Sequence, residues 1–364
     1  MDGHTFVQYR LEVQSSDFKY LITNELGEIL NKPTRYVVIC DEKVEQSARK
    51  IFSQVSDFIT LEVNENVKTL DGAGKILLEL AQRGVVRGDI LIAVGGGALQ
   101  DLVTLAASIY MRGLEWIYAP TTLMSMLDSC IGGKSSINLG KYKNLLGNIY
   151  PPKSVYIDKG FVATLSNVDI ACGLAEGVKI CFAASAADSS KFEEIIANWR
   201  LTSNDDFLEE AIFLSLEKKR WFVEIDEFDK KERKLLNFGH SFGHALEAAT
   251  DFAVPHGMGV FVGMHTAINF AGNPSQASSL LQWIEKEVSI VKSQVETLKI
   301  SRKTFIRAMK QDKKNSATEQ CLILPNEGGA LIEKLYPLSA DNLEKCFDTL
   351  VKSLNKLEMA HEVL

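Results

Sequence analysis

The chain has 364 residues, of which 46% are hydrophobic and 24% are charged, and its net charge is −7. This length suits a globular protein of two domains, and the acidic balance argues against a nucleic-acid-binding protein. No apolar run approaches the roughly 18 residues needed to cross a bilayer. The first residues show no basic segment followed by an apolar one, so we expect neither a membrane protein nor a secretory signal.

Strand and helix signals alternate over the first part of the chain. Apolar, β-branched runs predict strands at 35–41, 58–63, 89–96 and 114–122. Amphipathic segments between them predict helices at 41–55 and 64–84. This alternation predicts an α/β domain with a Rossmann-like, mostly parallel sheet that helices cover on both faces.

The pattern changes beyond residue 158. The Pro151-Pro152 pair is the expected hinge, and segments such as 167–186 and 207–226 have helical periodicity with few turn signals. We therefore expect an α/β domain at 1–158 and a mainly α-helical domain at 159–364. The six cysteines are scattered and form no C-x-x-C pair, which is typical of reduced, mostly buried thiols in a cytoplasmic protein.

Three consecutive glycines, at 95–97, lie where the third predicted strand ends. They allow the backbone to approach a ligand closely, and a helix beginning near Ala98 would turn its positive end toward a pyrophosphate. The spacing is not G-x-G-x-x-G, and a tight strand-to-helix turn would also explain the glycines. Asp41 and the PTT segment at 120–122 stand at other strand ends, where parallel sheets bind ligands, and they favour a binding loop.

A second glycine-rich stretch follows the fourth predicted strand. The charged and amide residues that we single out around its glycine turns are Arg112, which precedes that strand, and Asp128, Lys134, Lys143 and Asn144. Lysine and arginine beside glycine turns can hold a phosphate or a carboxylate, although most such charges are simply solvated. The apolar and glycine-punctuated character of 131–144 favours an anion site.

Three of the six histidines lie between residues 240 and 256. His240 and His244 are one helical turn apart and share a helix face, and His256 follows twelve residues after His244. Such a pair is often no more than two half-buried histidines on an amphipathic helix. The alternative is one or two ligands of a metal, joined by His256.

The order of these motifs resembles that of the dehydroquinate synthases and their relatives, the sugar phosphate cyclases. The matching motifs are GGG–D, MRG, PTTL, DSxxGGK, GKxKN, GLAExxK, RxxLNFGHxFGHAxE and HG, and they extend from about residue 36 to about residue 330. The resemblance implies an α/β domain followed by a helical domain, NAD and a divalent metal as cofactors, and a homodimer. The metal would normally be zinc, with cobalt as an alternative, and the substrate would be a phosphorylated sugar acid.

The resemblance also assigns roles residue by residue. It implies that Glu176, His240 and His256 bind the metal and that His244 is a partner of the substrate. The coenzyme residues would be Asp41, Glu65, Lys68, Gly96, Gly97, Asp101, Thr121, Thr122, Asp128 and Lys143. The residues for the phosphate and carboxylate of the substrate would be Lys134, Asn144, Lys179, Lys219, Arg233 and Asn237, with Lys313 or Lys314 as a further contact. Arg112 would reach the phosphate of the neighbouring subunit.

The reaction that the resemblance implies turns 3-deoxy-arabino-heptulosonate 7-phosphate into 3-dehydroquinate and phosphate. Bound NAD would take a hydride from a ring hydroxyl held by the metal, phosphate would leave, and the hydride would return. An intramolecular aldol would then close a carbocycle. The protein would be a phosphate-eliminating carbon–oxygen lyase of the shikimate pathway, which leads to the aromatic amino acids.

Three positions depart from the family pattern. Met258 stands where glutamate is usual, Gln100 stands where glycine is common, and the ending of AEGVKICF is unusual. They leave open a divergent cyclase of secondary metabolism that uses an amino analogue, sedoheptulose 7-phosphate or another sugar phosphate. Two further alternatives are an iron-type polyol dehydrogenase and a non-catalytic NAD-binding regulator. Glu176 and the GGK…GKxKN anion cluster argue against the dehydrogenase. Retention of Glu176, the cations assigned to the substrate and all three histidines argues against the regulator.

Overall fold

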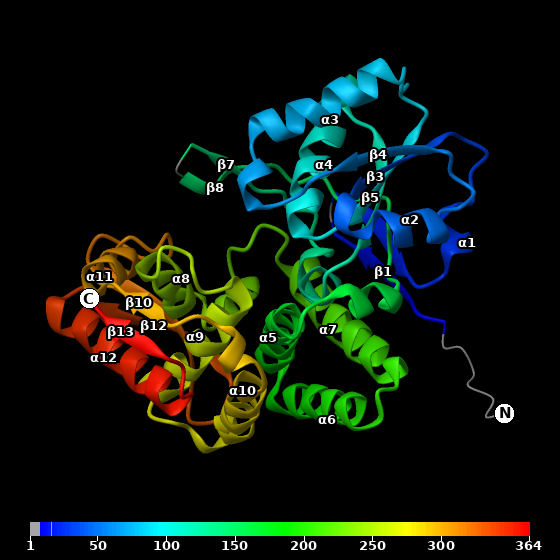
Figure 1. Ribbon diagram of the computed structural model, residues 1–364. Coiled ribbons are helices and arrows are strands. Elements are labelled where there is room, and N and C mark those ends of the chain that lie inside the picture. The colour runs from blue at the N-terminus through cyan, green and yellow to red at the C-terminus, as the bar shows by residue number, and fades with distance from the viewer. Residues whose placement is uncertain (1–7, 16, 141) are drawn as a thin grey trace. The chain divides into compact units, whose positions relative to one another are not determined.

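The computed structural model describes residues 8–15, 17–140 and 142–364, which form two compact units (Figure 1). The first unit holds the described residues up to Leu165 together with Val223–Glu227, and the second holds Ser166–Phe222 and Phe228–Leu364. The expectation that the chain begins without an export signal concerns residues 1–7, which lie outside the described residues.

A seven-stranded sheet forms the centre of the first unit, with strand order β1-β2-β9-β6-β5-β3-β4. The bounds are β1 (Arg10–Gln14), β2 (Lys19–Thr23), β3 (Tyr36–Asp41), β4 (Asp57–Leu61), β5 (Ile90–Gly95), β6 (Glu115–Pro120) and β9 (Ser154–Tyr156). All neighbours pair in parallel except β1 and β2, which are antiparallel. The predicted Rossmann-like sheet is therefore confirmed, and β1, β2 and β9 are additions that the sequence pattern did not predict.

The central strands are buried on both faces, which explains their unbroken apolar sequences. Every residue of β5 is buried. The helices of this unit are α1 (Leu26–Ile29), α2 (Glu45–Ile51), α3 (Leu70–Gln82) and α4 (Gly97–Ile109). In α3 the Thr69 hydroxyl caps the first turn by accepting from the Gly72 amide, and Ala73, Ile76 and Leu80 form the buried face.

Two features follow β6 before the first unit ends. β7 (Ile137–Leu139) and β8 (Tyr142–Leu146) form a separate antiparallel pair, visible beside α3 and α4 in Figure 1. Pro151 and Pro152, where we expected the hinge, lie inside the first unit, and one residue separates them from β9. Proline lacks a backbone N–H and is tolerated outside the paired residues of a strand, which accounts for this place.

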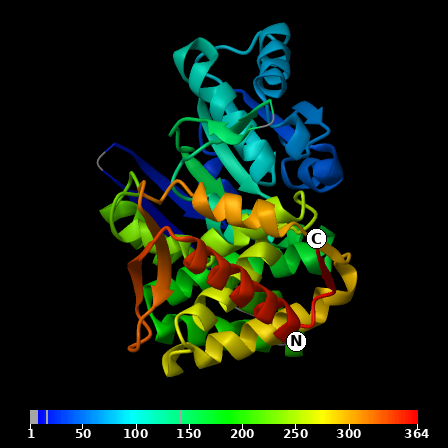
Figure 2. The same ribbon diagram turned by 90° about the vertical axis from the view of Figure 1, so that its left-hand side faces the viewer.

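The second unit is mainly helical, as predicted. Its helices are α5 (Asn167–Ala184), α6 (Ala186–Thr202), α7 (Asp205–Ile225), α8 (His240–Ala249), α9 (His256–Phe270), α10 (Ser278–Val291), α11 (Arg302–Lys310) and α12 (Ala340–Lys356). Two small sheets, which the sequence pattern did not predict, pair β10 (Leu298–Ile300) with β13 (His361–Val363) and β11 (Glu319–Pro325) with β12 (Leu331–Pro337). Figure 2 shows α11 and α12 side by side at the surface of this unit.

Helix α9 lies at the centre of the second unit. Thirteen of its fifteen residues are buried, and a helix that is apolar on all sides belongs in a protein core. It packs against α5, α8, α10 and α12. The start of α5 is fixed by a capping box, in which Ser166 and Asp169 each bond to the backbone of the other. This packing brings α5, α8 and α9 together.

The structure bears on two further expectations, the state of the cysteines and the absence of a membrane-spanning segment. All six cysteines are buried and free, in agreement with the prediction of reduced, mostly buried thiols. Across the described residues, no helix combines the length and the apolar character needed to cross a membrane.

Candidate active site

One carboxylate and two imidazoles converge in the second unit. Glu176, on α5, is 1% exposed, and its Oε1 lies 3.2 Å from Nε2 of His256 and 3.8 Å from Nε2 of His240. The two histidines are the first residues of α8 and α9. Three segments that are far apart in sequence therefore bring one oxygen and two nitrogens to the same point.

Close backbone packing makes this convergence possible. A Cβ atom on Gly257 would lie 2.3 Å from Cα of Cys172, so α9 begins almost in contact with the backbone of α5. A Cβ atom on Gly263 would lie 2.0 Å from the carbonyl oxygen of Gly239. Any side chain at either position would force the helices apart, because interiors are packed too densely to absorb such overlaps. Gly257, the glycine of the HG motif, and Gly263 are thus needed for the close approach of the helices.

The hydrogen bonds of the two histidines orient their rings. Nδ1 of His256 lies 2.8 Å from Oε1 of Glu247, and Nδ1 of His240 lies 3.3 Å from the carbonyl oxygen of Phe238. A carbonyl or ionised carboxylate only accepts, so each Nδ1 donates. In neutral histidine this leaves the Nε2 lone pair directed toward Glu176, which is the arrangement that a metal ligand requires.

Glu247 had no role in the sequence prediction, although the sequence contained a signal for it. His240, His244 and Glu247 stand at positions i, i+4 and i+7 of α8, which share one helix face. The added Cβ of a residue at Gly259 would lie only 3.2 Å from Oε1 of Glu247, so the glycine leaves room for the carboxylate.

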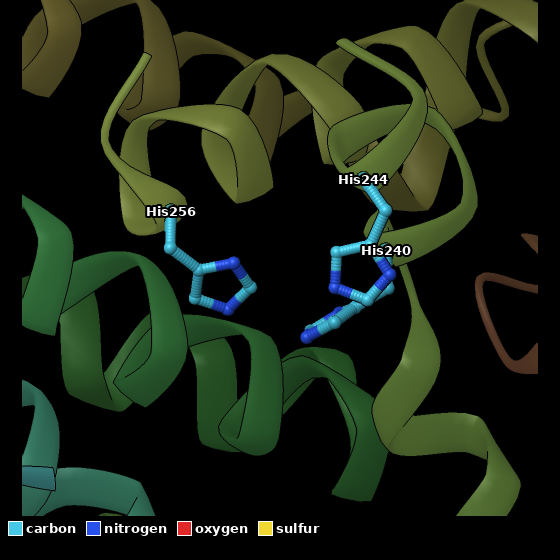
Figure 3. Close-up of side chains that lie close together, drawn as sticks. All are labelled: His240, His244 and His256. Carbon is cyan, nitrogen blue, oxygen red and sulfur yellow. The ribbon is translucent and has the colours of Figure 1, made fainter. Parts of the chain in front are cut away.

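His244 belongs to the same group of side chains. The ligand nitrogens of His240, His244 and His256 all lie within 4.8 Å of one another, and Figure 3 shows the three rings around a common space. His244 is the most exposed of the three. Burial lowers the pKa of His244, the charge of Glu247 raises it, and the charge of His256 lowers it further, with smaller opposite effects from Lys314 and Asp312.

The ionisation of the cluster follows from burial and neighbouring charge. Burial would raise the pKa of Glu176, but Lys179, with which it forms an ion pair, and the two histidines hold that pKa well below its ordinary value. Burial would lower the pKa of His256, but Glu176 and Glu247 raise it to about 10. Burial and the charge of Lys179 hold the pKa of His240 well below its usual range. Without a metal, His256 therefore carries a second proton, on Nε2, at neutral pH, and a metal would displace that proton.

Three predicted substrate residues, Lys179, Lys219 and Arg233, are buried cations on elements that pack together. Their elements meet at a small apolar cluster formed by Ile180, Phe222 and Leu236. Lys179 adjoins the first of these residues, and the other two cations lie one turn before theirs. Asn237 ends the turn that carries Arg233 and donates to the carbonyl oxygen of Lys234 at 3.1 Å.

Lys313 and Lys314, either of which could be the further substrate contact by sequence, differ in their surroundings. Lys313 is exposed, whereas Lys314 is partly buried and lies 2.7 Å from Asp312. Asp312 in turn accepts a hydrogen bond from Ser241 of α8 at 2.8 Å. Lys314 is therefore tied to the histidine-bearing helix.

Three of the predicted coenzyme residues of the first unit, Asp41, Gly96 and Gly97, lie at the carboxyl ends of neighbouring strands β3 and β5. The chain forms β3, then β4 on one side of it and β5 on the other, so strand order reverses between β3 and β5, and ligands of open parallel sheets bind at such a reversal. Asp41 ends β3, and Gly96 and Gly97 follow the end of β5 at the start of α4. A Cβ atom on Gly96 would lie 2.9 Å from the methyl group of Thr122, so a side chain there would clash.

A polar network joins four further predicted residues. Nζ of Lys68 lies 3.1 Å from Glu65, 3.3 Å from Asp101 and 2.8 Å from Oδ1 of Asn144. Asn138, which the sequence did not point to, accepts from the backbone of Asn144 at 2.9 Å and donates to Glu65 at 3.1 Å. Asn144, expected with the substrate, thus shares a network with residues expected at the coenzyme.

The other predicted residues of the first unit lie in separate places. The backbone of Thr121 donates to the carbonyl oxygen of Gly95 at 3.1 Å, which joins the ends of β6 and β5. Asp128 lies in a π-helical turn at Ser125–Ser129. Arg112, Lys134 and Lys143 are exposed.

Comparison with known proteins matches both units to one family. Residues 58–172 match the family described as 3-dehydroquinate synthase N-terminal, and residues 173–315 match 3-dehydroquinate synthase C-terminal. The 3-dehydroquinate synthase of Thermoanaerobacter sp. strain X514 is 33% identical over 325 residues, which are 85% of this chain and 90% of that protein. The enzyme of the same name from Sulfurisphaera tokodaii is 34% identical, over 78% of this chain and 82% of its own.

Solved structures share the fold at lower identity. A 2-deoxy-scyllo-inosose synthase is 22% identical with a TM-score of 0.77, covering 93% of this chain and 98% of its own. The 2-epi-5-epi-valiolone synthase of Streptomyces hygroscopicus, solved with NAD⁺ and Zn²⁺, is 21% identical with a TM-score of 0.78, covering 94% and 99%. An iron-containing alcohol dehydrogenase from Corynebacterium glutamicum is 12% identical with a TM-score of 0.62, covering 90% of each chain. By its sequence matches along both units, the chain belongs to the 3-dehydroquinate synthase family.

Proposed function

We propose that this chain is a 3-dehydroquinate synthase that converts 3-deoxy-arabino-heptulosonate 7-phosphate to 3-dehydroquinate and phosphate. The observation that carries the proposal is the convergence of Glu176, His240 and His256 on one point in a chain of this family. Relatives of this name match most of the chain at about one third identity, which supports the same phosphate-eliminating reaction.

A divalent metal fits the donor atoms of the second unit. Two Nε2 atoms and one carboxylate oxygen form a His₂Glu set, which is typical of catalytic zinc and leaves positions for substrate oxygens. When bound, zinc or cobalt would supply Lewis acidity that lowers the pKa of a substrate hydroxyl. Glu176 contributes the negative charge of the set, His240 and His256 contribute neutral nitrogens, and Glu247 fixes the tautomer of His256.

The buried cations of the second unit suit the substrate's charge. A phosphate monoester carries roughly −1.5 to −2 at neutral pH, and a carboxylate adds a further negative charge. We assign Lys179, Lys219, Arg233 and Asn237 to these groups. Lys314, rather than Lys313, is the further contact, because it is tied through Asp312 to α8. His244 is placed to hold or move a proton at a substrate oxygen.

The reversal of strand order in the first unit suits NAD. The backbone amides of Gly96 and Gly97 at the start of α4 would receive the pyrophosphate. We assign Asp41, Glu65, Lys68 and Asp101 to the adenosine and ribose, and Thr121, Thr122, Asp128 and Lys143 to the nicotinamide side. When bound, NAD supplies reversible hydride transfer. On this account residues 1–158 serve the coenzyme, and 159–364 serve the metal and most of the substrate.

Lys134, Asn144 and Arg112 complete the proposed set, and Arg112 carries the proposal of a homodimer. Arg112 has a left-handed backbone with φ of 66°, next to Met111 with φ of 49°. Such conformations are uncommon outside glycine and concentrate at functional sites. We assign Arg112 to the phosphate held by the neighbouring subunit. A cytoplasmic location is part of the same proposal.

The direct test is turnover of the heptulosonate phosphate with catalytic NAD and added zinc or cobalt. We expect one phosphate released for each carbocycle formed, with no net NADH. Accumulation of NADH would indicate a dehydrogenase of the iron-containing type, and absence of turnover with every sugar phosphate would indicate a non-catalytic NAD-binding protein.

A divergent cyclase is the second candidate, and Met258 is the observation that favours it. This residue is fully buried in the first turn of α9, two residues after His256, where the family usually has glutamate. A panel of the heptulosonate phosphate, its amino analogue, sedoheptulose 7-phosphate and glucose 6-phosphate separates the candidates. Arg233→Leu should lower turnover of the carboxylated substrates far more than that of the others, because the substrate carboxylate would lose its paired guanidinium. Equal losses would contradict the assignment of Arg233.

A further inference from the structure

Gln100 forms a side-chain clasp that the proposed function does not use. It lies on α4, one turn after the glycine loop, and is 2% exposed. Its amide Nε2 donates to the carbonyl oxygen of Ser129 at 2.8 Å, and the Ser129 hydroxyl donates to its Oε1 at 2.7 Å. A buried amide is costly unless its groups are paired, and here one residue pairs both ends.

The clasp joins two segments that the proposed function assigns to the coenzyme. One is the start of α4, with Gly97, where an added Cβ would lie 3.8 Å from the Ser129 hydroxyl. The other is the π-helical turn Ser125–Ser129, closed by a hydrogen bond from the amide of Cys130 to the carbonyl of Ser125 at 3.1 Å. This turn carries Asp128.

A π-helical turn needs such support. It is rare, is found mostly as a single turn and frequently occurs at functional sites. Its start is held by the hydroxyls of Thr122 and Ser125, which lie 2.7 Å apart. The end of the turn, Ser129, is held by its two hydrogen bonds with Gln100. Asp128 therefore lies between two fixed points, and a glycine at position 100 would leave the second point without its side-chain partner.

We propose that Gln100 is a positioning residue for the nicotinamide side of the coenzyme site. By clasping Ser129 it fixes the π-helical turn, and thereby Asp128, relative to the glycine loop at the start of α4. The inference rests on the proposed function, because it concerns the same NAD site. It adds a residue that departs from the family pattern and acts through another residue rather than by touching the coenzyme.

The test compares two probes in the full-length protein, NAD⁺ and ADP-ribose, by isothermal titration calorimetry. ADP-ribose keeps the adenosine, pyrophosphate and second ribose but lacks the nicotinamide. Gln100→Leu removes both hydrogen bonds at similar volume, and we expect it to weaken NAD⁺ binding about tenfold, from the loss of two ordinary hydrogen bonds. The affinity for ADP-ribose should stay within about twofold.

Ser129→Ala keeps the inference falsifiable if Gln100→Leu does not fold, and two further variants sharpen the test. Ser129→Ala should give a smaller loss of the same kind, and the double variant Gln100→Leu/Ser129→Ala should lose less than the sum of the two single variants. Thr104→Val is the matched control, since its hydroxyl donates to the carbonyl oxygen of Gln100 at 2.7 Å without touching the clasp. It should leave the ratio of the two affinities unchanged.

Two results overturn the inference while leaving the proposed function intact. One is an unchanged NAD⁺ affinity in Gln100→Leu and Ser129→Ala, and the other is an equal loss for both probes. Failure of the unaltered protein to bind either probe is a different result, because it would remove the proposed NAD site itself and the inference with it.

Discussion

The histidine cluster of the second unit and the polar network of the first unit hold their side chains in different ways. The donors of the cluster come from three helices whose backbones are in contact, and glycines such as Gly257 allow that contact. The network lies where strands of a parallel sheet end, and its members hold one another by hydrogen bonds and ion pairs around Lys68.

This difference predicts how each site should respond to a substitution. A site held by dense packing should fail when a small volume or a single ligand changes, because the surrounding helices cannot readjust cheaply. A site held by a network of polar bonds should weaken by degrees, because each bond contributes only a modest share.

The largest effect is expected from Glu176→Gln. The amide is close in shape but carries no charge, so the cluster should lose its metal and phosphate release should stop. Metal analysis after gel filtration and a circular dichroism spectrum would check this. Glu287→Gln is the control, since it breaks an ion pair of a buried carboxylate with Arg200, at 2.6 Å, elsewhere in the same unit. Metal retention by Glu176→Gln would contradict the ligand assignment.

A smaller loss is expected from Glu247→Gln. The amide can donate as well as accept, so the tautomer of His256 is no longer fixed, and metal affinity should fall about 10- to 100-fold. Chelator competition and the visible spectrum of the cobalt-loaded protein measure this. Glu285→Gln, which alters a carboxylate 3.5 Å from the buried His265, should leave both readings unchanged. Equal metal affinities and cobalt spectra in the two variants would show that Glu247 does not orient His256 for the metal.

Gly257→Ala tests the packing directly. The new methyl group would overlap the backbone of Cys172, and the free energy of unfolding should fall by about 1–3 kcal/mol, as for other overpacked sites. Chemical denaturation measures the change. Gly74→Ala, on α3, adds the same group where nothing lies within 4 Å and should raise stability by about 0.5–1 kcal/mol. A neutral Gly257→Ala would contradict the packing argument.

The mildest effect concerns pH and Asp101. Burial raises the pKa of Asp101 to about 6, although Lys68 lowers it. Above that pH the carboxylate is ionised and can accept from ribose hydroxyls, and below it the proton removes an acceptor. NAD⁺ affinity should therefore fall as pH drops below about 6, by up to tenfold per unit. Titrations from pH 5 to 8 would show this, and Asp101→Asn should bind more weakly with no such dependence. A pH-independent affinity in the unaltered protein would exclude this role.

Much of the fold was predictable because it depends on local patterns. The strands that became β3, β4, β5 and β6 are apolar runs between amphipathic helices, and parallel sheets require that alternation. Several of the missed strands are short or half-exposed, whereas β11 was missed although it is a largely buried strand of seven residues. β9 has three residues, and β12 is exposed along most of its length, so neither shows a continuous apolar run.

The site was predictable only in part, for a similar reason. Motifs name His240, His256 and Glu176, but they do not say which residue holds each imidazole in place. Gln100 could be noted as a departure, yet its bond to Ser129 spans 29 residues and exists only in the folded chain. Asn138 carried no signal at all, since an asparagine in a glycine-rich turn is common.

The most direct measurement is a crystal structure of the protein loaded with zinc, with anomalous data at the zinc edge. The account predicts one peak about 2.0–2.2 Å from Nε2 of His240, Nε2 of His256 and a carboxylate oxygen of Glu176, with His244 outside the ligand set. A peak bound by His244 in place of Glu176, or no peak near these side chains, would contradict it.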